Sequence, residues 1–143
     1  MEPTTVGKVL VRAVVENLDD LFALRKGLLQ ADRVRRVEVS DALIDSGATG
    51  LMLPARLIAE LGLEPLRIRP ARTIAGHTPL QVYRAVRLCI QGRDCISDVS
   101  EIPDEFSVVV GQVPLELMDW VVDLRGQRLI GNPEHSGEQM VEG

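Results

Sequence analysis

Residues 42–49 read Ala42-Leu43-Ile44-Asp45-Ser46-Gly47-Ala48-Thr49, and this segment says most about the fold. Upstream, residues 37–40 alternate between apolar and polar side chains, which predicts a strand. Residues 42–44 are all apolar, so the strand is expected to run into the hydrophobic core. Asp45 stands at its end, where burial of a carboxylate costs free energy unless the group is hydrogen-bonded or its pKa is raised.

A proline-to-glycine segment follows. Pro54 opens a predicted helix over residues 55–61, and Gly62 closes it, which is the usual placement of these two residue types. The order of apolar strand, glycine and proline-opened helix recurs over residues 107–120, where Pro114 opens the second helix. This echo predicts two related halves about a pseudo-two-fold axis, of which only the first carries a carboxylate at its turn.

The rest of the chain alternates strand-like runs with turn signals, which predicts a mainly β fold. Extended segments are expected at 6–15, 68–74, 80–90, 95–102, 121–124 and 127–130, with residues 75–79 and 125–126 joining hairpins. Residues 18–29 predict a short helix or an ordered loop, because Gly27 interrupts their apolar spacing. We expect one or two short helices in all.

The length of 143 residues indicates a single domain. We place that domain at residues 1–133, with a helical or loop insertion at 18–33 and a polar C-terminal tail over 134–143. The chain from Gly131 onward is polar and is expected to be frayed. The insertion could cover a dimer edge or act as a regulatory prosegment, and the sequence leaves both readings open. Because only 3% of residues are aromatic, the core must consist of Val, Leu, Ile and Ala.

The charge pattern argues against nucleic-acid and membrane partners. The net charge is −5, whereas nucleic-acid binding normally requires a basic surface. Arginines do cluster at Arg33, Arg35 and Arg36 and again at Arg67, Arg69 and Arg72, but they alternate with apolar residues as on a solvated strand face. No apolar run approaches the roughly 18 residues that span a bilayer, and no secretory signal is present. We therefore expect a cytoplasmic protein.

The two cysteines are expected to be structural. Cys89 and Cys95 flank the turn-like segment 91–94, so they would lie diagonally across a hairpin. A disulfide is not expected in a reducing compartment. No histidine lies nearby to complete a metal site, and we expect neither a metal nor an organic cofactor.

An isolated Asp-Ser-Gly tripeptide is most often a turn, because Asp and Ser bond their own backbone there. Here the apolar strand before it, the residues Ala48 and Thr49 after it and the echo at Val109-Val110-Gly111 favour a second reading. Together these residues resemble the signature of the retropepsin-like aspartic peptidases, which is two apolar residues, Asp, Ser or Thr, Gly, and Ala or Ser. The resemblance extends from about Val6 to about Pro133 and is closest to small bacterial members of that family.

This resemblance implies a retropepsin-like acid-protease half-barrel that is active as a two-fold homodimer and cleaves extended peptide or protein substrates. Asp45 would be the catalytic residue. By the same resemblance, Ser46 bonds across the dimer, Gly47 lies beside the catalytic water, Ala48 lies beside substrate and Thr49 completes the active loop. Residues Ile74, Ala75, Gly76 and His77 would form a substrate-covering flap, and Val110 and Gly111 the loop of the second half.

The chemistry requires a second carboxylate. Peptide hydrolysis needs one group to take a proton from water and another to donate one. A single Asp has a reference pKa of roughly 3.9 and is ionised at neutral pH, whereas two carboxylates about 3 Å apart share one proton, as in aspartic proteases. No other aspartate stands in a comparable setting; those considered are Asp94, Asp98, Asp119 and Asp123. The partner would then be Asp45 of a second copy, which a two-fold interface supplies.

Two other functions remain as alternatives. A peptide-binding or dimerisation module could keep this fold without catalysis, although the intact Asp45-Ser46-Gly47 argues against it. Phosphoryl transfer through Asp45 would require a glycine-rich phosphate loop and companion acidic residues, which the sequence lacks.

Overall fold

The computed structural model describes residues 8–73 and 76–137, and strands form most of that part of the chain. The strands are β1 (Val9–Asn17), β2 (Arg36–Ile44), β3 (Leu51–Pro54), β4 (Glu64–Thr73), β5 (Gly76–Ile90), β6 (Arg93–Ile102), β7 (Val109–Val110), β8 (Trp120–Asp123) and β9 (Arg128–Gly131). The helices are α1 (Leu18–Arg25), α2 (Ala55–Leu61) and α3 (Gln112–Leu117), with 3₁₀ turns η2 (Ala31–Arg33) and η3 (Pro133–His135). The mainly β prediction is confirmed.

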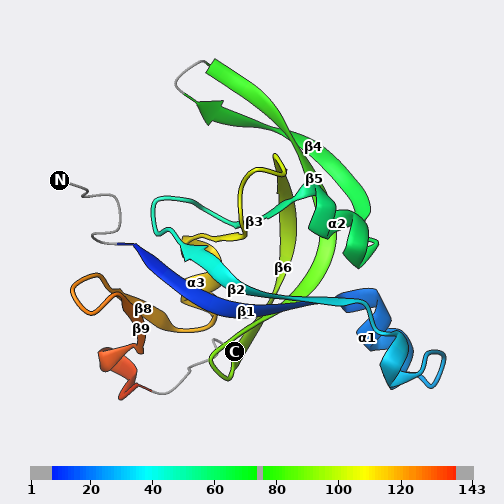
Figure 1. Ribbon diagram of the computed structural model, residues 1–143, viewed down its shortest axis with the longest axis horizontal. Helices are drawn as coiled ribbons and strands as arrows, with labels where there is room; N and C mark the ends of the chain where they lie inside the picture. The colour runs from blue at the N-terminus through cyan, green and yellow to red at the C-terminus, as the bar shows by residue number, and fades with distance from the viewer. Residues whose placement is uncertain (1–7, 74–75, 138–143) are drawn as a thin grey trace.

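The strands β1 to β7 form one sheet in the order β1-β2-β7-β3-β6-β5-β4, and β5 closes it. One edge of β5 pairs first with β4, as far as Arg84 opposite Glu64, and then with β1, from Val86 opposite Asn17. The pairing of β1 with β5 turns the sheet into a small barrel. The first half of β5 and all of β4 continue past the closure as a hairpin that projects from the barrel (Figure 1).

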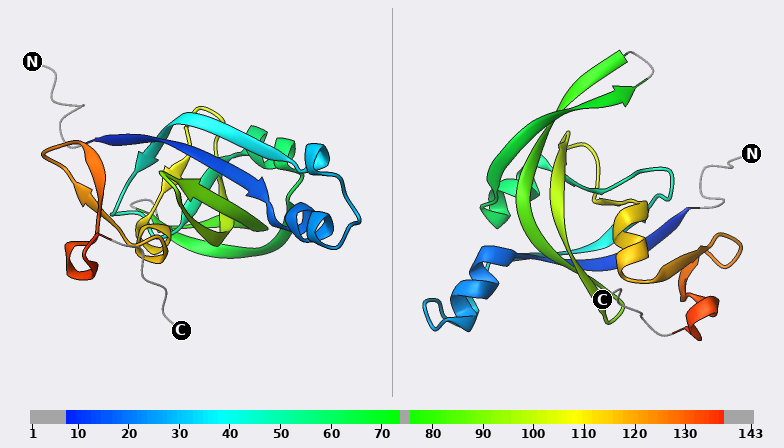
Figure 2. Two further views of the ribbon diagram at one scale, coloured as in Figure 1. Left: turned by 90° about the horizontal axis from the view of Figure 1, so that it is seen from below. Right: turned by 180° about the vertical axis from the view of Figure 1, so that it is seen from behind.

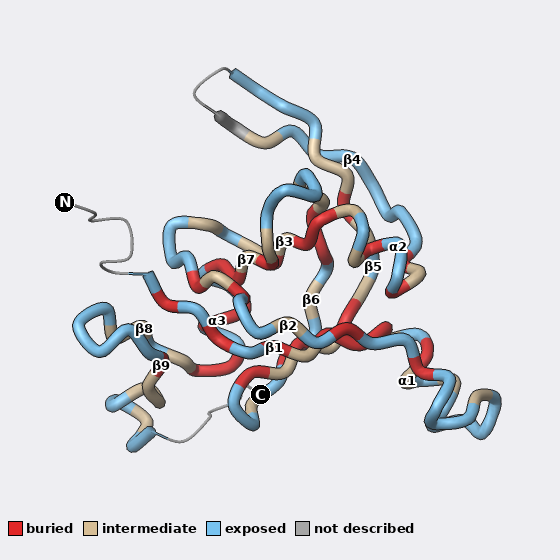
Figure 3. The backbone as a smooth tube through the Cα atoms, viewed as in Figure 1, coloured by how far each residue is buried: buried red, intermediate tan, exposed pale blue. Residues whose placement is uncertain are grey.

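The core lies inside the barrel and is aliphatic, as the composition predicted. Its largest fully buried side chains are Leu51, Leu53, Leu61, Leu88, Ile90, Leu115, Met118, Val9, Val15, Val86, Val99 and Val108. Figure 3 shows buried positions concentrated where the strands cross and exposed ones along the projecting hairpin. Burying one such side chain contributes roughly 1.5–3 kcal/mol, so this cluster is the main stabilising element.

The three α-helices of the described residues include one more than expected, because residues 18–25 are helical. The helix at 55–61 is confirmed, with Pro54 at its N-cap and Gly62 in a left-handed conformation at φ 64°. The second proline-opened helix was placed wrongly: it covers 112–117, not 114–120. Because the first amides of a helix have no intrahelical acceptor, proline fits within the first turn and does not mark the first residue.

The connections of the β4–β5 and β5–β6 hairpins are shorter than predicted, whereas the β8–β9 connection covers residues 124–127 and is longer than the predicted 125–126. Residues 76–79 belong to β5, so the expected five-residue connection is wrong, and Ile74 and Ala75 lie outside the described residues. The β5–β6 turn consists of Gln91 and Gly92, both with positive φ, as tight hairpins favour.

The two cysteines belong to this β5–β6 hairpin. Leu88 lies opposite Cys95 and Cys89 opposite Asp94, so the cysteines are on opposite faces and both are free. Their separation by the sheet rules out a bond between them without strand rearrangement.

Two segments at the periphery of the barrel, α1 and the C-terminal segment after β9, are tied to it by hydrogen bonds; Figure 2 shows where each lies. Asn17 caps α1 by accepting from the amide of Asp20 at 3.0 Å, and the Asp20 carboxylate binds the Arg35 guanidinium at 2.8 and 2.9 Å. In the C-terminal segment, the expectation of a frayed chain from Gly131 is wrong as far as Gly137, because β9 pairs with β8 and η3 packs against the end of α3.

Among the described residues, none of the helices has the length and apolar character needed to span a bilayer.

Candidate active site

Residues 45–50 connect β2 to β3, and β7 fills the space between those two strands. β7 runs parallel to β2 and antiparallel to β3. The amide of Leu43 donates to the carbonyl of Val108 at 2.8 Å, and the amide of Asp45 donates to the carbonyl of Val110 at 2.9 Å. The backbone of Asp45 is therefore held by β7, the strand in which the sequence repeats the apolar run and glycine of the Asp45 segment.

The start of α3 holds the other side of the loop. The amides of Gly111, Gln112 and Val113 donate to the carbonyls of Gly50 at 2.9 Å, Ala48 at 2.8 Å and Thr49 at 2.9 Å, respectively. Helix-opening amides have no acceptor within their own helix, so the loop carbonyls satisfy groups that would otherwise require water. The side chain of Gln112 turns along the helix to Glu116 at 2.9 Å and takes no part.

Gly111 is required at this contact. A Cβ atom there would lie 2.5 Å from the Gly50 carbonyl oxygen and 2.7 Å from that of Ala48, both of them backbone atoms. Leu43 and Ile44 pair in parallel register with Val109 and Val110, so Gly111 follows β7 at the level where Asp45 follows β2. Sequence reasoning thus brought together residues that the fold also brings together, but it did not predict the backbone contacts of Gly50, Gln112 and Val113.

Asp45 is exposed in the single chain, so the expectation of a costly buried carboxylate is wrong at this level. Its Oδ1 accepts from the amide of Gly47 at 2.9 Å, and its carbonyl accepts from the amide of Ala48 at 3.0 Å. Among the described residues no cation pairs with it. Ser46, Gly47 and Thr49 are also exposed, and Ala48 is half-buried.

The other aspartates considered from the sequence are paired elsewhere. Asp94 lies 3.0 Å from Arg87, Asp98 3.7 Å from Arg67, Asp119 2.5 Å from His135 and Asp123 3.1 Å from Arg128. Over residues 8–73 and 76–137, no group of three or more His, Cys, Asp or Glu side chains could hold a metal ion.

A row of apolar residues crosses the sheet beside Asp45, and the sequence analysis missed it. Leu43 lies opposite Val109 in β7, and Val109 lies opposite Met52 in β3. Residues paired across strands share a face of the sheet, and the neighbouring positions Ile44 and Val110 face the core. Leu43, Val109 and Met52 therefore lie on the opposite face and are half-buried.

The predicted flap lies at the tip of the β4–β5 hairpin. Thr73 is opposite Gly76 and Arg72 is opposite His77. Gly76 has φ of 110°, a value that favours glycine, and both Gly76 and His77 are exposed. The other two residues of the predicted flap, Ile74 and Ala75, lie outside the described residues.

Comparisons with known proteins add little to this geometry. No family model matches the chain, and no curated protein matches it. Among solved structures, the chain is similar to the solution structure of Simian Foamy Virus (mac) protease, at 20% identity and a TM-score of 0.47, over 75% of this chain and 91% of that one. A likeness this distant does not by itself establish an activity, so a function must be argued from the Asp45 loop.

Proposed function

We propose that this chain is an aspartic endopeptidase of the retropepsin-like type, which hydrolyses peptide bonds through the paired Asp45 carboxylates of a homodimer. One observation carries the proposal: Asp45 is exposed and lacks a cation among the described residues, yet its loop is held by backbone hydrogen bonds from β7 and α3. Catalytic groups act best when their positions are fixed before substrate binds.

The second carboxylate comes from symmetry. A two-fold axis beside Asp45 places that residue next to its own copy. At about 3 Å the two carboxylates share one proton, so that one accepts a proton from the attacking water while the other donates one to the substrate. Ser46 is exposed beside Asp45, where its hydroxyl can bond across the axis.

Exposed apolar residues next to the loop support this dimer. Val113, whose amide binds the Thr49 carbonyl, is 46% exposed, and Leu117 one helical turn later is 49% exposed. Residues four apart lie on one helix face. A second copy docked beside Asp45 would cover this face and remove it from water.

The substrate is an extended peptide. Next to Asp45 it would meet the half-buried row of Leu43, Val109 and Met52, which suits aliphatic side chains. The hairpin of β4 and β5 would cover it as a flap, since exposed strand edges bind extended peptides by backbone pairing.

Substitution of Asp45 tests the proposal. Wild-type protein should cleave an unstructured polypeptide at a rate that rises with protein concentration as dimerisation requires. Asp45→Asn should lower this rate by roughly 10²-fold or more, while circular dichroism and thermal unfolding stay unchanged. Asp41→Asn is the matched control, because Asp41 is also exposed and lies four residues earlier on β2. Undiminished cleavage by Asp45→Asn would refute the proposal.

A non-catalytic peptide-binding or dimerisation module is the second candidate. The contacts from β7 and α3 that hold the loop are backbone contacts, so its shape does not depend on catalysis. Dimerisation and peptide binding by wild-type protein, without cleavage at any pH from 3 to 8 or so, would favour this module.

A further inference from the structure

The apolar row beside Asp45 continues across the sheet to the projecting hairpin. Met52 lies opposite Ser100 in β6, Ser100 opposite Val82 in β5, and Val82 opposite Arg67 in β4. Cross-strand partners share a face, so Arg67 lies on the same face of this continuous sheet as Leu43. The catalytic loop and the hairpin are thus joined by one face of the sheet, which runs from the half-buried apolar row at Leu43 through the buried Ser100 and Val82 to the exposed Arg67.

Arg69 adds a second positive charge to that face. It lies two residues after Arg67 on the same strand and opposite Leu80, so its side chain leaves the sheet on the same side. Arg69 is exposed, and no described residue forms an ion pair with it. The projecting hairpin carries it away from the barrel, as the course of β4 in Figure 1 illustrates.

The anion that Arg67 binds on this face is loosely held. The Arg67 guanidinium lies 3.7 Å from the carboxylate of Asp98, and the two side chains are 54% and 46% exposed. A half-exposed pair at this separation is screened by water and adds little stability. Arg67 can therefore exchange this carboxylate for that of a bound peptide, and Arg69 lies on the same side of β4.

Two of the three arginines in the other cluster of the sequence, Arg35 and Arg36, behave differently. Arg35 binds Asp20 at 2.8 Å, and Arg36 binds the buried Glu16 at 2.8 Å. Those guanidiniums are neutralised within the chain and tie strands together. The contrast indicates that the charge on β4 is available to a partner.

We propose that Arg67 and Arg69 select peptide substrates that carry an acidic side chain some residues away from an aliphatic cleavage site. The inference rests on the proposed function and names its substrate class. Arginine suits this role, because its planar guanidinium binds a carboxylate through two parallel hydrogen bonds. The residues would act as specificity determinants, because they lie on β4 and not in the Asp45 loop.

Peptide binding to the Asp45→Asn chain tests the proposal without cleavage. We would measure fluorescence anisotropy with peptides that share an aliphatic centre and differ only in Glu or Gln at successive flanking positions. At one of these positions, the Glu peptide should bind about tenfold more tightly than its Gln twin, and the ratio should fall as salt is raised. Arg67→Gln combined with Arg69→Gln should reduce the ratio to near one.

Three further variants sharpen the test. Asp98→Asn removes the competing anion and should raise the preference for Glu, the opposite of the arginine changes. Arg69→Lys keeps the charge without the two-bond geometry and should fall between wild type and Arg69→Gln. Arg25→Gln is the matched control, because Arg25 is an exposed arginine at the end of α1.

The outcomes separate this inference from the peptidase. Equal binding of Glu and Gln peptides at every position, no binding of either, or a preference that survives the double substitution overturns the inference. Cleavage by wild-type protein without any Glu preference removes the inference and leaves the peptidase. Selective binding by Asp45→Asn without cleavage by wild type removes the peptidase and leaves the charge selection.

Discussion

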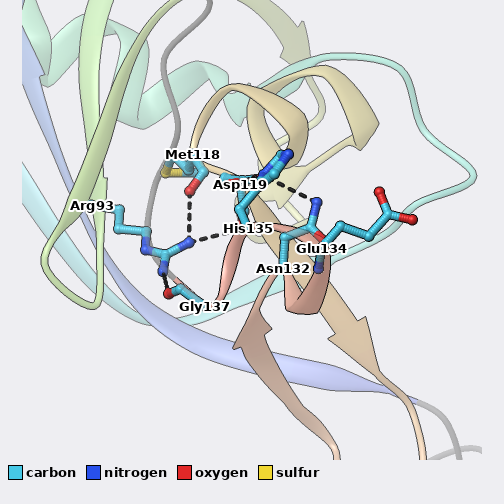
Figure 4. A network of polar contacts seen from close by, with 7 residues as sticks. All are labelled: Arg93, Met118, Asp119, Asn132, Glu134, His135 and Gly137. Carbon is cyan, nitrogen blue, oxygen red and sulfur yellow. Dashed lines mark hydrogen bonds and ion pairs between the residues drawn. The ribbon is translucent and has the colours of Figure 1, made fainter.

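Two aspartates that each follow an element of secondary structure have opposite surroundings. Asp45 follows β2, is exposed, and its side chain accepts one backbone hydrogen bond, from Gly47. Asp119 follows α3, is only 7% exposed, and its carboxylate binds Asn132 at 3.1 Å and His135 at 2.5 Å. Figure 4 shows how the side chains from the C-terminal segment converge on Asp119.

The backbone around Asp119 is equally well bound. Arg93 donates to the carbonyls of Asp119 at 2.7 Å and Met118 at 3.1 Å, and also to that of Gly137. Its guanidinium lies 4.0 Å from the centre of the Trp120 ring, in reach of a cation–π contact. This network joins β6, α3, β8 and η3.

The difference separates structural from functional carboxylates. Asp119 adopts φ of 58°, a left-handed conformation that costs most residues free energy and that Asp tolerates better than most, and the contacts of the network hold it there. Asp45 contributes little to the packing of its own chain, although its loop is held as firmly as a structural one. A residue whose position is fixed while its side chain stays available is suited to chemistry.

The largest difference in the free energy of unfolding should appear when each of the two aspartates is replaced by alanine in turn. Asp119→Ala should lower the free energy of unfolding by about 3 kcal/mol, because it leaves His135 and Asn132 without their acceptor. Asp45→Ala should change it by about 0.5 kcal/mol or less. Urea unfolding measures both. Asp119→Asn should be milder than Asp119→Ala, because Asn tolerates positive φ; equal losses at positions 45 and 119 would contradict the comparison.

A substitution at Gly111 would disrupt the contact between the start of α3 and the Asp45 loop. Gly111→Ala places a Cβ against the carbonyls of Gly50 and Ala48 and should destabilise the fold by about 2 kcal/mol. Gly50→Ala is the control in the same loop, because nothing lies within 4 Å of a Cβ there. Thermal and urea unfolding would give the difference. A tolerated Gly111→Ala would show that the loop is not held by the contact described.

The Asp20–Arg35 pair extends the comparison to pH. The Arg35 hydrogen bonds lower the pKa of Asp20 from its ordinary 3.8, although partial burial opposes them. A carboxyl whose pKa is lower in the folded state stabilises the fold above its unfolded value and loses that contribution as pH falls through the folded value. The free energy of unfolding of the wild type should therefore fall more steeply with decreasing pH below about pH 4. In Asp20→Asn it should depend less on pH in this range. An unchanged pH dependence in Asp20→Asn would contradict the pairing.

The cysteines should show the smallest effect. Burial raises the pKa of Cys95 to about 11 and also raises that of Cys89, which is only half-buried. Because thiolate is the reactive form, iodoacetamide near pH 8 should modify Cys89 before Cys95 in the native protein. Mass spectrometry of partly alkylated protein measures the order. Mild oxidation should not join the two, and a bridge would contradict their placement on opposite faces.

Local chemistry in the sequence was enough to predict several elements. The alternation at 37–40 and the apolar run to Ile44 identified β2, and Pro54 and Gly62 marked the ends of α2 because caps depend on only a few neighbouring residues. The echo at 107–111 correctly pointed to a segment that packs against the Asp45 loop. The role of Asp45 as one half of a catalytic pair stays a prediction.

The remainder depended on contacts between distant segments. The sequence did not indicate that β7 lies between β2 and β3, or that one edge of β5 pairs with both β4 and β1. Nor did it indicate that Arg67 lies on the same face of the sheet as Leu43. It placed Asp119 on a helix, where the fold buries it at a strained turn. The residue pattern determines which face of a strand is apolar, but strand order and register follow from which faces can be buried together, and only the folded chain decides that.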